Sequence, residues 1–361
     1  MIMTITAVLT VAIVVMTLLP LSRSSHWWVR GMDFPRLQIA FLCAALLVAQ
    51  WWLLDIAELP AQAMMAATAA CLLYQAWWII PYTRPYPNEV KLAESHDPSR
   101  RIRILSSNVL QTNRSSDLLI GLVREHDPDI LVALETDAWW QQKLDVLEDD
   151  YPHTMKCALE NTYGMLVYSR LPLKDPATQF LVQEDVPSMH AMVELKSGQS
   201  VRMHFLHPAP PSPTENDEST ERDAELLVVA KSVVEVDGPV IVAGDLNDVG
   251  WSRTTRLFRK ISGLLDPRVG RGMFNSFHAD HWFIRWPLDH LFHSRHFTLS
   301  FMKRLPTCGS DHFPVLVELV LEEENGAGQE GLVADADDLQ EAEEKIAEEP
   351  VTPSDVHEPK A

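Results

Sequence analysis

The chain has 361 residues, of which 47% are hydrophobic and 22% charged, and this balance excludes a wholly disordered or collagen-like chain. At roughly 150 residues per domain, its length predicts two or three structural units. The formal net charge is -20, from 30 Lys+Arg and 50 Asp+Glu, which argues against a protein that wraps nucleic acid uniformly. The apolar and the acidic residues are each concentrated in one part of the chain.

Three long segments without charged residues come first. They span Ile2–Leu21, 37–54 and 59–83, and about twenty residues of α-helix cross the ~30 Å hydrocarbon core of a bilayer. A tryptophan pair lies at or just beyond the end of each segment, where amphipathic rings prefer the headgroup level; the pairs are Trp27-Trp28, Trp51-Trp52 and Trp77-Trp78. The pattern predicts a three-helix membrane anchor over residues 1–83.

Two other interpretations of these segments are weaker. A cleaved signal peptide needs a basic start and a small-residue cleavage site, whereas no Lys or Arg precedes Arg23 and the first segment ends in Leu-Leu-Pro-Leu. A buried helical core of a soluble protein rarely has three segments of spanning length with tryptophan borders. We therefore expect retained transmembrane helices.

The loop charges indicate an orientation. The first loop has three arginines and the second loop, 55–58, has no basic residue, while Arg84 and Lys91 follow the third helix. Because basic loops favour the cytoplasmic side, the N-terminus is expected outside and everything after Arg84 in the cytoplasm. The three arginines are Arg23, Arg30 and Arg36.

Two further segments flank the main globular unit. Residues 84–100 contain three prolines and no sustained periodicity, and we expect a short linker that keeps the next unit close to the bilayer. Residues 322–361 contain 14 Asp+Glu, 2 Lys+Arg and no aromatic residue. This composition predicts an acidic disordered tail, or at best a frayed helix around 337–349. The tail carries a net charge of -12, which leaves -8 for the rest.

Residues 101–321 are long enough for one large core. Short runs rich in β-branched residues predict strands, and two stretches, 116–125 and 221–236, predict helices. The mixture indicates an α/β fold of packed sheets with outer helices. The predicted strands lie at 102–105, 129–134, 165–168, 191–195, 201–206, 240–243, 288–292 and 313–319.

Polar residues recur at the ends of these strands. Strand ends converge on one edge of a sandwich, so these side chains are expected to share a single site rich in carboxylates and histidines. The residues are Asn108, Glu135, His207, Asp245, Asn247, Asp289, Asp311 and His312. His290 is also close, but alternation along a strand sends it to the opposite face, and we expect it to be structural.

The order and spacing of these residues resemble those of a known family. Asn108, Leu134-Glu135, Gly244-Asp245-Leu246-Asn247, Leu288-Asp289-His290 and Ser310-Asp311-His312-Phe313-Pro314 are similar to motifs of the endonuclease/exonuclease/phosphatase superfamily, which includes deoxyribonuclease-I-like nucleases, inositol polyphosphate 5-phosphatases and sphingomyelinases. The resemblance covers about 101–321. It implies a four-layer α/β sandwich, in which two packed mixed β-sheets are flanked by helices.

The residue types suit metal-dependent phosphoester hydrolysis, which needs a divalent cation, an oriented water and donors for the developing charge. Glu135 is the best metal ligand, with Asn108 and Asp311 beside it, and oxygen ligands suit Mg²⁺ or Mn²⁺. His312 suits proton transfer, with Asp289 as its carboxylate partner. The resemblance implies that Asp245 orients or activates water, that Asn247 contacts phosphate, and that His207 binds phosphate or protonates the leaving group.

Each of these residues also has an ordinary structural explanation. Taken singly, Glu135 is a solvated strand cap, Asp245-Leu246-Asn247 an Asx turn and Asp311-His312 a surface pair; six family positions in order favour a real site. Leu110 stands where some nucleases have an acidic residue, and Tyr163 is left unassigned. Four basic residues with helical spacing follow the Gly-Asp-Leu-Asn motif: Arg253, Arg256, Arg259 and Lys260. Their helix face is expected to meet phosphate, the bilayer or solvent.

The expected function is a membrane-anchored, divalent-metal-dependent phosphatase or phosphodiesterase acting on a membrane-proximal or lipid-linked phosphate. The anchor favours such a substrate, and the acidic tail would repel a polyanion. An anchored nuclease is the first alternative and an inactive scaffold the second. The chain also resembles bacterial membrane-anchored members of the superfamily, some of which act on polyprenyl pyrophosphates with the catalytic unit outside. That resemblance opposes the cytoplasmic placement from loop charge.

Overall fold

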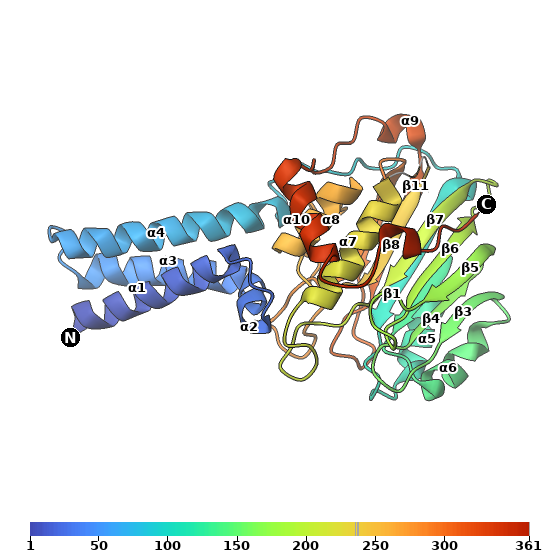
Figure 1. Ribbon diagram of the computed structural model, residues 1–361, viewed down its shortest axis with the longest axis horizontal. Coiled ribbons are helices and arrows are strands. Elements are labelled where there is room, and N and C mark those ends of the chain that lie inside the picture. Colours follow the sequence, from blue (N-terminus) through green and yellow to red (C-terminus); the bar gives the residue numbers. More distant parts are fainter. Residues whose placement is uncertain (235, 237, 361) are drawn as a thin grey trace.

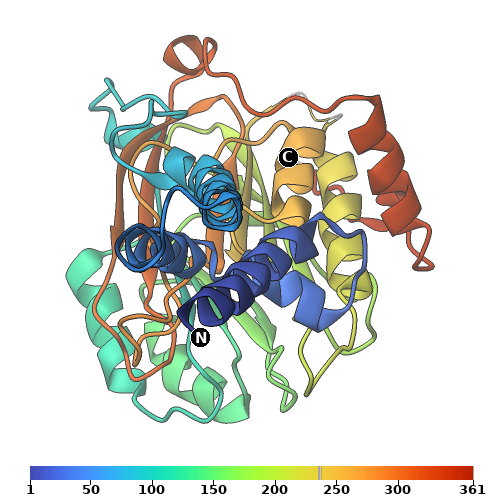
Figure 2. The same ribbon diagram turned by 90° about the vertical axis from the view of Figure 1, so that its left-hand side faces the viewer.

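The computed structural model describes residues 1–234, 236 and 238–360. A bundle of three long helices projects from one side of a two-sheet sandwich (Figure 1). Viewed along the bundle, the helices stand in front of the sandwich (Figure 2), and the segment between α1 and α3 contacts it through Ser25 and Trp27. The sandwich therefore faces the end of the bundle where α1 ends, α3 begins and α4 ends.

The bundle consists of α1 (Ile2–Leu18), α3 (Arg36–Leu53) and α4 (Leu59–Ile79). Several of its polar side chains are buried between the helices, where Gln50 donates to Thr10 (2.9 Å) and Thr68 (3.2 Å). Apolar side chains instead cover the outside, which suits contact with lipid. With their flanking turns, the segments Ile2–Leu21, Arg36–Leu53 and Leu59–Tyr82 are long and apolar enough to cross a membrane, by length and composition.

The sandwich has a six-stranded and a five-stranded mixed sheet. The first has the order β10-β11-β1-β2-β4-β3 and the second β5-β6-β7-β8-β9. In each sheet one pair is parallel, β1 with β2 and β7 with β8, and the other pairs are antiparallel. The strands are β1 (Arg101–Asn108), β2 (Ile130–Leu134), β3 (His153–Cys157), β4 (Met165–Ser169), β5 (Leu173–Gln179), β6 (Ser188–Glu194), β7 (Ser200–Leu206), β8 (Val240–Asp245), β9 (Asp289–His293), β10 (Phe297–Arg304) and β11 (Val315–Leu321).

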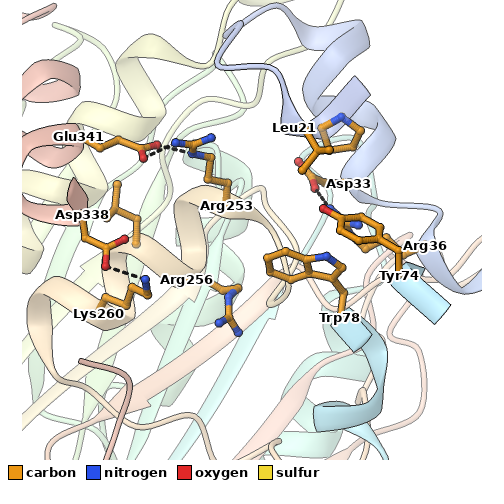
Figure 3. Close-up of a pocket in the computed structure, with 12 residues that line it drawn as sticks. Leu21, Asp33, Arg36, Tyr74, Trp78, Arg253, Arg256, Lys260, Asp338 and Glu341 are labelled. Atoms are coloured by element: carbon orange, nitrogen blue, oxygen red, sulfur yellow. Dashed lines mark hydrogen bonds and ion pairs between the residues drawn. The ribbon is translucent and has the colours of Figure 1, made fainter. Parts of the chain in front are cut away.

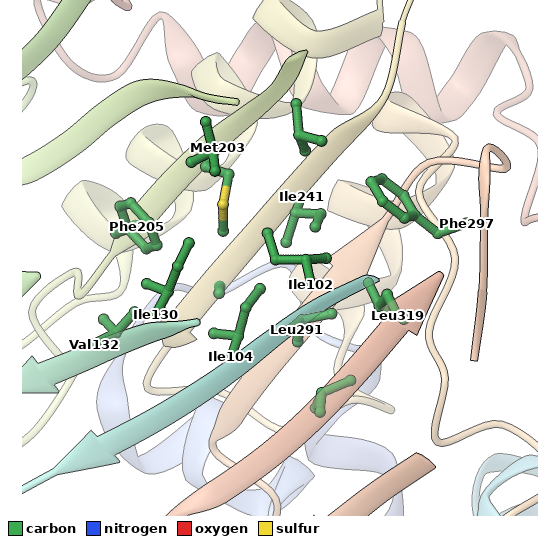
Figure 4. Packing of buried hydrophobic residues seen from close by; sticks show 14 of the residues in the cluster. Ile102, Ile104, Ile130, Val132, Met203, Phe205, Ile241, Leu291, Phe297 and Leu319 are labelled. Atoms are coloured by element: carbon green, nitrogen blue, oxygen red, sulfur yellow. The ribbon is translucent and has the colours of Figure 1, made fainter. Parts of the chain in front are cut away.

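The main core lies between the two sheets (Figure 4). Alternate residues of each strand enter it, because successive side chains of a strand point to opposite faces. On β1 these are Ile102 and Ile104, and on β8 they are Ile241 and Ala243. The inward positions that follow are Ser106 and Asn108 on β1 and Asp245 on β8, beyond the end of the apolar core.

Helices cover both outer faces. On the first sheet lie α5 (Ser116–His126) and α6 (Ala138–Leu144), and on the second lie α7 (Thr220–Val234) and α8 (Arg253–Ser262). The predicted fold class is confirmed: two packed mixed sheets with outer helices form four layers. The remaining short elements are α2 (Trp27–Arg30), α9 (Glu323–Gly326), α10 (Ala336–Ile346), η1 (Leu19–Leu21), η2 (Gly31–Asp33), η3 (Ile80–Tyr82), η4 (Pro98–Arg100), η5 (Asp145–Leu147) and η6 (Pro353–Asp355).

The eight predicted strands correspond to β1, β2, β4, β6, β7, β8, β9 and β11. The strands β3, β5 and β10 were not predicted, because the edge strand β5 contains Pro176 and several exposed polar residues and the other two mix polar and apolar residues. The predicted helix 221–236 includes residue 235, which lies outside the described residues; α7 ends at Val234.

The segments expected as linker and tail both lie against the sandwich. In the linker, Glu89 pairs with Arg259 at 2.5 Å, and Ala93 N donates to Leu299 O at 2.9 Å. In the tail, α10 covers most of the 337–349 stretch for which a frayed helix was the alternative to disorder, and it buries Ala342 and Ile346 against the second sheet's outer helices. Its carboxylates also have basic partners on α7 and α8, which offset the repulsion that composition alone suggests.

Candidate active site

Three polar side chains enter the site by simple strand alternation. Asn108 on β1, Asp245 on β8 and Asp289 on β9 each follow the inward register of their strands and lie where the apolar core ends. All three are at most 2% exposed. The two sheets therefore contribute to one edge of the sandwich, as the sequence predicts. Alternation sends His290 to the other face, where it contacts Arg268 (2.6 Å) and the Asp248 carbonyl (2.8 Å).

Glu135 reaches the site by a different route. Leu134 already points into the core, so regular alternation would turn Glu135 outward. A backbone φ of 59° at Glu135, in the left-handed region, breaks the alternation and brings its Oε1 within 2.7 Å of Asn108 Nδ2. Such a conformation costs on the order of 1 kcal/mol for a non-glycine residue, and here it directs a carboxylate into the site.

Gly164 supports this turn from behind. The Thr136 amide donates to the Gly164 carbonyl at 2.9 Å, and the Leu159 amide donates to the Thr136 carbonyl at 3.0 Å. A Cβ on Gly164 would lie 1.8 Å from the Thr136 carbonyl oxygen. Only glycine therefore lets β4 approach the turn that carries Glu135.

Asn108 connects the two sheets. Its Nδ2 donates to Glu135 Oε1 (2.7 Å) and to Asp245 Oδ2 (3.1 Å), while its Oδ1 accepts from the Leu110 amide (3.1 Å). The other Asp245 oxygen accepts from the Asn247 amide at 2.9 Å. Two carboxylates from different sheets are thereby held around one amide.

His312 forms the second half of the site. Its Nδ1 lies 2.8 Å from Asp289 Oδ2 and 3.6 Å from Asp245 Oδ2. Burial opposes the charged imidazolium, but Asp289 and Asp245 outweigh it and raise the pKa of His312 to about 10. Burial likewise favours the neutral acid of Asp245, yet His312 and His207 lower the pKa of that carboxyl. The pair is therefore a carboxylate beside a protonated imidazole.

The donor set at Glu135 fits a divalent cation. Burial raises the pKa of Glu135 to about 7; the Asn108 hydrogen bond and the charge of His312 lower it, and Asp245 and Asp311 add to the increase. A bound cation would favour the ionised form of this buried carboxylate. Asp311 is partly exposed beside it. Ligand atoms of Asp245, Asp289 and His312 also lie within 4.8 Å of one another, but His312 Nδ1 already has its hydrogen bond to Asp289. The oxygens of Glu135 and Asp311 are the better match for Mg²⁺ or Mn²⁺. Asn108 presents Nδ2 to Glu135 and Oδ1 to the Leu110 amide, so its amide would have to turn over to add the expected oxygen ligand.

His207 and Asn247 lie at the rim of the site. His207 is 1% exposed, burial lowers its pKa to about 4, and its Nδ1 is buried with no hydrogen-bond partner among the described residues. Asn247, with φ at 51°, donates its Nδ2 to the Pro208 carbonyl at 3.0 Å. The structure thus gathers all eight predicted residues at one edge, with Asn247 turned toward the loop after His207.

Two aromatic neighbours were not predicted as site residues. The Tyr163 ring lies 5.5 Å from the His207 ring, and its hydroxyl donates to Glu215. The Phe277 ring lies 5.0 Å from the His312 ring. The only sequence signal for Tyr163 was its place before Gly164, whereas Phe277 lies in a loop without a motif.

Comparisons with known proteins agree with this geometry. Residues 104–312 match the model of the Endonuclease/Exonuclease/phosphatase family. No curated protein sequence matches the chain. Among solved structures, the chain is similar to an endonuclease/exonuclease/phosphatase protein from Beutenbergia cavernae, with 17% identity and a TM-score of 0.50, over 62% of this chain and 72% of that one.

Two further structures give the same TM-score of 0.50 and the same identity of 17%. One is D. rerio TDP2 complexed with a single-strand DNA product, which the match covers to 98%, with 61% of this chain. The other is the human Nocturnin catalytic domain with a bound sulfate anion, covered to 95%, with 62% of this chain. At this identity the likeness establishes the fold alone.

Proposed function

The chain belongs to the endonuclease/exonuclease/phosphatase family, whose members cleave phosphoester bonds, and on this premise we propose that it is a membrane-anchored, divalent-metal-dependent phosphatase or phosphodiesterase. Its proposed substrate is a membrane-proximal or lipid-linked phosphate. One observation carries this proposal: three loops at the site, which we call the rim loops, are hydrogen-bonded to the membrane anchor.

The first rim loop follows His207. The Trp27 amide donates to the Asp217 carbonyl (2.9 Å), and the Ser219 amide donates to the Ser25 carbonyl (3.0 Å). The contact joins the segment between α1 and α3 to the loop after His207. Substrate entering beside His207 would therefore pass close to the headgroup level.

The second rim loop follows Asn247. Trp251 Nε1 donates to the Asp33 carbonyl at 2.8 Å, and the Tyr82 hydroxyl donates to the Gly250 carbonyl at 2.6 Å. Both anchor residues are at most 2% exposed. The loop that positions Asn247 is thus held by two segments of the anchor, the one before α3 and the one after α4.

The third rim loop, residues 277–286, contacts His312 through Phe277. Gln38 Nε2 donates to the Phe283 carbonyl at 2.8 Å, which places the tip of this loop beside the start of α3. At that tip Trp282 is 82% and Phe283 54% exposed. Exposed aromatic residues at this level are typical of an interfacial membrane contact.

The basic residues of α8 give little support to nucleic acid as substrate. Arg253 is paired with Glu341, Arg259 with Glu89 and Lys260 with Asp338. Paired cations release fewer counterions from a phosphate backbone, and this release supplies much of the affinity for DNA. The DNA bound to TDP2 nevertheless keeps an anchored nuclease as the alternative.

In the proposed reaction each residue has a role set by its charge and position. Glu135, Asn108 and Asp311 would hold the cation, which when bound neutralises phosphate charge and lowers the pKa of water. Asp245, kept ionised by His312, accepts a proton from the attacking water. His312, oriented by Asp289, donates to a phosphoryl oxygen, and His207 and Asn247 contact the phosphate.

The full-length protein in detergent micelles with Mg²⁺ tests this function. We expect it to hydrolyse a polyprenyl pyrophosphate faster than it nicks supercoiled plasmid, and to lose activity with EDTA until Mg²⁺ or Mn²⁺ is restored. Glu135→Gln should lower the rate by about 100-fold or more, whereas Glu125→Gln, on the exposed face of α5, should not change it.

Two results would contradict the proposal. Rapid plasmid nicking that Glu135→Gln abolishes, with no turnover of lipid substrate, would establish the nuclease alternative. Absence of hydrolysis of plasmid, lipid pyrophosphate and a soluble phosphodiester reporter, despite Mg²⁺ binding by calorimetry, would establish an inactive scaffold.

A further inference from the structure

A cavity of about 240 Å³ lies between the membrane anchor and α8, apart from the active site. We call it the interfacial pocket. On the anchor side it is lined by Leu21, Tyr74 and Trp78, and on the sandwich side by Arg253, Arg256 and Lys260 (Figure 3). At ~30 Å³ per water molecule the space is large enough for a phosphate group.

The pocket lies where the apolar segments leave the expected membrane. Leu21 is the last residue of the first apolar segment, and Trp78 lies in the last turn of α4. This is the level at which lipid headgroups meet protein, and basic side chains there attract anionic lipids.

Most of the charges in the pocket are already balanced. Arg36 is 2.5 Å from Asp33, Arg253 is paired with Glu341, and Lys260 is 2.6 Å from Asp338. These ion pairs appear as dashed lines in Figure 3. In the pairs of Arg253 and Lys260, the carboxylate belongs to α10.

Arg256 is the exception. Among the residues that the structure describes, it has no carboxylate within ion-pair distance. Its guanidinium lies 5.0 Å from the centre of the Trp78 ring, which Arg36 approaches to 4.9 Å. Burial also lowers the pKa of the Arg256 guanidinium, so an anion beside it would relieve an unfavourable environment.

An apolar surface continues from the pocket along the bundle. Leu21 is 52% and Leu18 53% exposed on the first helix, and Trp77 is 75% exposed on α4. A ligand with a phosphate at one end and acyl chains at the other would match both the basic pocket and this apolar surface. A free phosphate would match only the basic pocket.

From this arrangement we propose that the interfacial pocket binds the phosphate headgroup of an anionic phospholipid, with Arg256 as its main contact. Asp338 and Glu341 of α10 form ion pairs with Lys260 and Arg253. The carboxylates of α10 therefore compete with the lipid phosphate for the basic side chains of α8. Arginine is suited to this role because its planar fork donates two hydrogen bonds to one phosphate. The proposal rests on membrane anchorage but not on the hydrolase activity.

The test titrates the full-length protein in detergent with phosphatidylglycerol or phosphatidylcholine of equal acyl chains and counts bound lipid by native mass spectrometry. We expect wild-type protein to retain phosphatidylglycerol about tenfold more tightly. Arg256→Gln should remove this preference, since a charge-assisted contact typically accounts for about that factor. Arg124→Gln, an exposed arginine on α5, removes the same charge and should keep the preference.

A second variant acts in the opposite direction. Asp338→Asn combined with Glu341→Gln frees Lys260 and Arg253, and should tighten phosphatidylglycerol binding severalfold. Misfolding can explain a loss of binding in Arg256→Gln, but it cannot explain tighter phosphatidylglycerol binding in the double variant. The double variant therefore tests the pocket even if Arg256→Gln disturbs the fold.

Three results would overturn the proposal. They are equal retention of the two lipids by wild-type protein, equal loss of binding in Arg256→Gln and Arg124→Gln, and displacement of the lipid by an equal concentration of inorganic phosphate. Failure of the anchor itself is detected separately, because alkaline carbonate would then extract the protein from membranes. Hydrolysis of a soluble reporter should be unchanged in Arg256→Gln, which separates this site from the active site.

Discussion

Gly164 lies directly behind the turn that carries Glu135, and the close approach leaves no room for a side chain. We predict that Gly164→Ala destabilises the protein by about 1–3 kcal/mol and displaces Glu135. The affinity for Mg²⁺ at a temperature where both proteins are folded should fall, as measured by calorimetry. The matched control is Gly121→Ala on α5, where a Cβ meets nothing within 4 Å and alanine favours the helix. Unchanged Mg²⁺ affinity in folded Gly164→Ala would mean that the turn does not position the metal ligand.

Glu225 is a buried carboxyl outside the active site. It is 2% exposed on α7 and accepts a hydrogen bond from Ser188 at 2.5 Å. Burial raises its pKa to about 7 from 4.5, despite the hydrogen bond. The folded protein therefore binds a proton that the unfolded chain releases, and its stability falls as the pH rises from about 4.5 through 7.

We predict that Glu225→Gln removes this fall. At about 1.4 kcal/mol per pKa unit, the variant should be more stable than wild type by up to ~3 kcal/mol at pH 8 and by little at pH 5. Thermal unfolding at a series of pH values measures the difference. The exposed Glu348→Gln should leave the profile unchanged, and a parallel profile for Glu225→Gln and wild type would refute the assignment.

At the scale of elements, α10 shows how an acidic segment can fold against an acidic protein. Ile346 is 8% and Ala342 0% exposed in the cluster with α7 and α8. Lys345 Nζ also lies 2.6 Å from the fully buried Asp223. Burial of a few apolar residues and local charge pairing together outweigh the net charge of the segment.

We predict that Ile346→Ala lowers the free energy of unfolding by about 2 kcal/mol or more, because a buried isoleucine loses its contacts. Leu339→Ala on the same helix is the control. Leu339 is 48% exposed, and its loss should cost less than about 0.5 kcal/mol. Chemical denaturation of both variants gives the two values, and equal values would indicate that α10 is not docked in solution.

At the scale of the whole molecule, the anchor and the site form one body, because the rim loops join both. We predict that Trp282→Ala combined with Phe283→Ala lowers hydrolysis of a bilayer-embedded substrate by about tenfold, since lost apolar burial of this size is worth more than 1.4 kcal/mol. Hydrolysis of a soluble phosphodiester reporter should stay within about twofold. Equal losses on both substrates would place these residues in catalysis rather than at the membrane.

For the orientation of the whole molecule, loop charge predicts a cytoplasmic catalytic unit. Two of the three arginines in the first loop, Arg30 and Arg36, are buried beside Asp33. They therefore stabilise the folded loop in addition to contributing to the charge that predicts the orientation. A β-galactosidase fusion at the C-terminus should be active and an alkaline phosphatase fusion inactive. The same reporters fused after Ala57, at the far end of the bundle, should give the reverse. An active phosphatase at the C-terminus would reverse the orientation.

The sequence by itself determined the elements whose signal is local. Length and apolarity indicate the three membrane-length helices, and the motifs around Glu135, Asp245 and His312 indicate the family, because each is a short, ordered pattern. Strand alternation also predicts that Asn108 and Asp289 point inward while His290 points outward.

Only the tertiary structure decided what depends on residues far apart in the chain. The left-handed turn at Glu135 requires Gly164 behind it, and the docked α10 has basic partners on α8. Among the described residues Arg256 has no ion-pair partner, while α10 pairs with its neighbours Arg253 and Lys260. The rim loops are joined to the anchor by a few hydrogen bonds, such as that from Tyr82 to Gly250. None of these contacts can be predicted from periodicity or composition, because the residues that make them are close in space but far apart in the sequence.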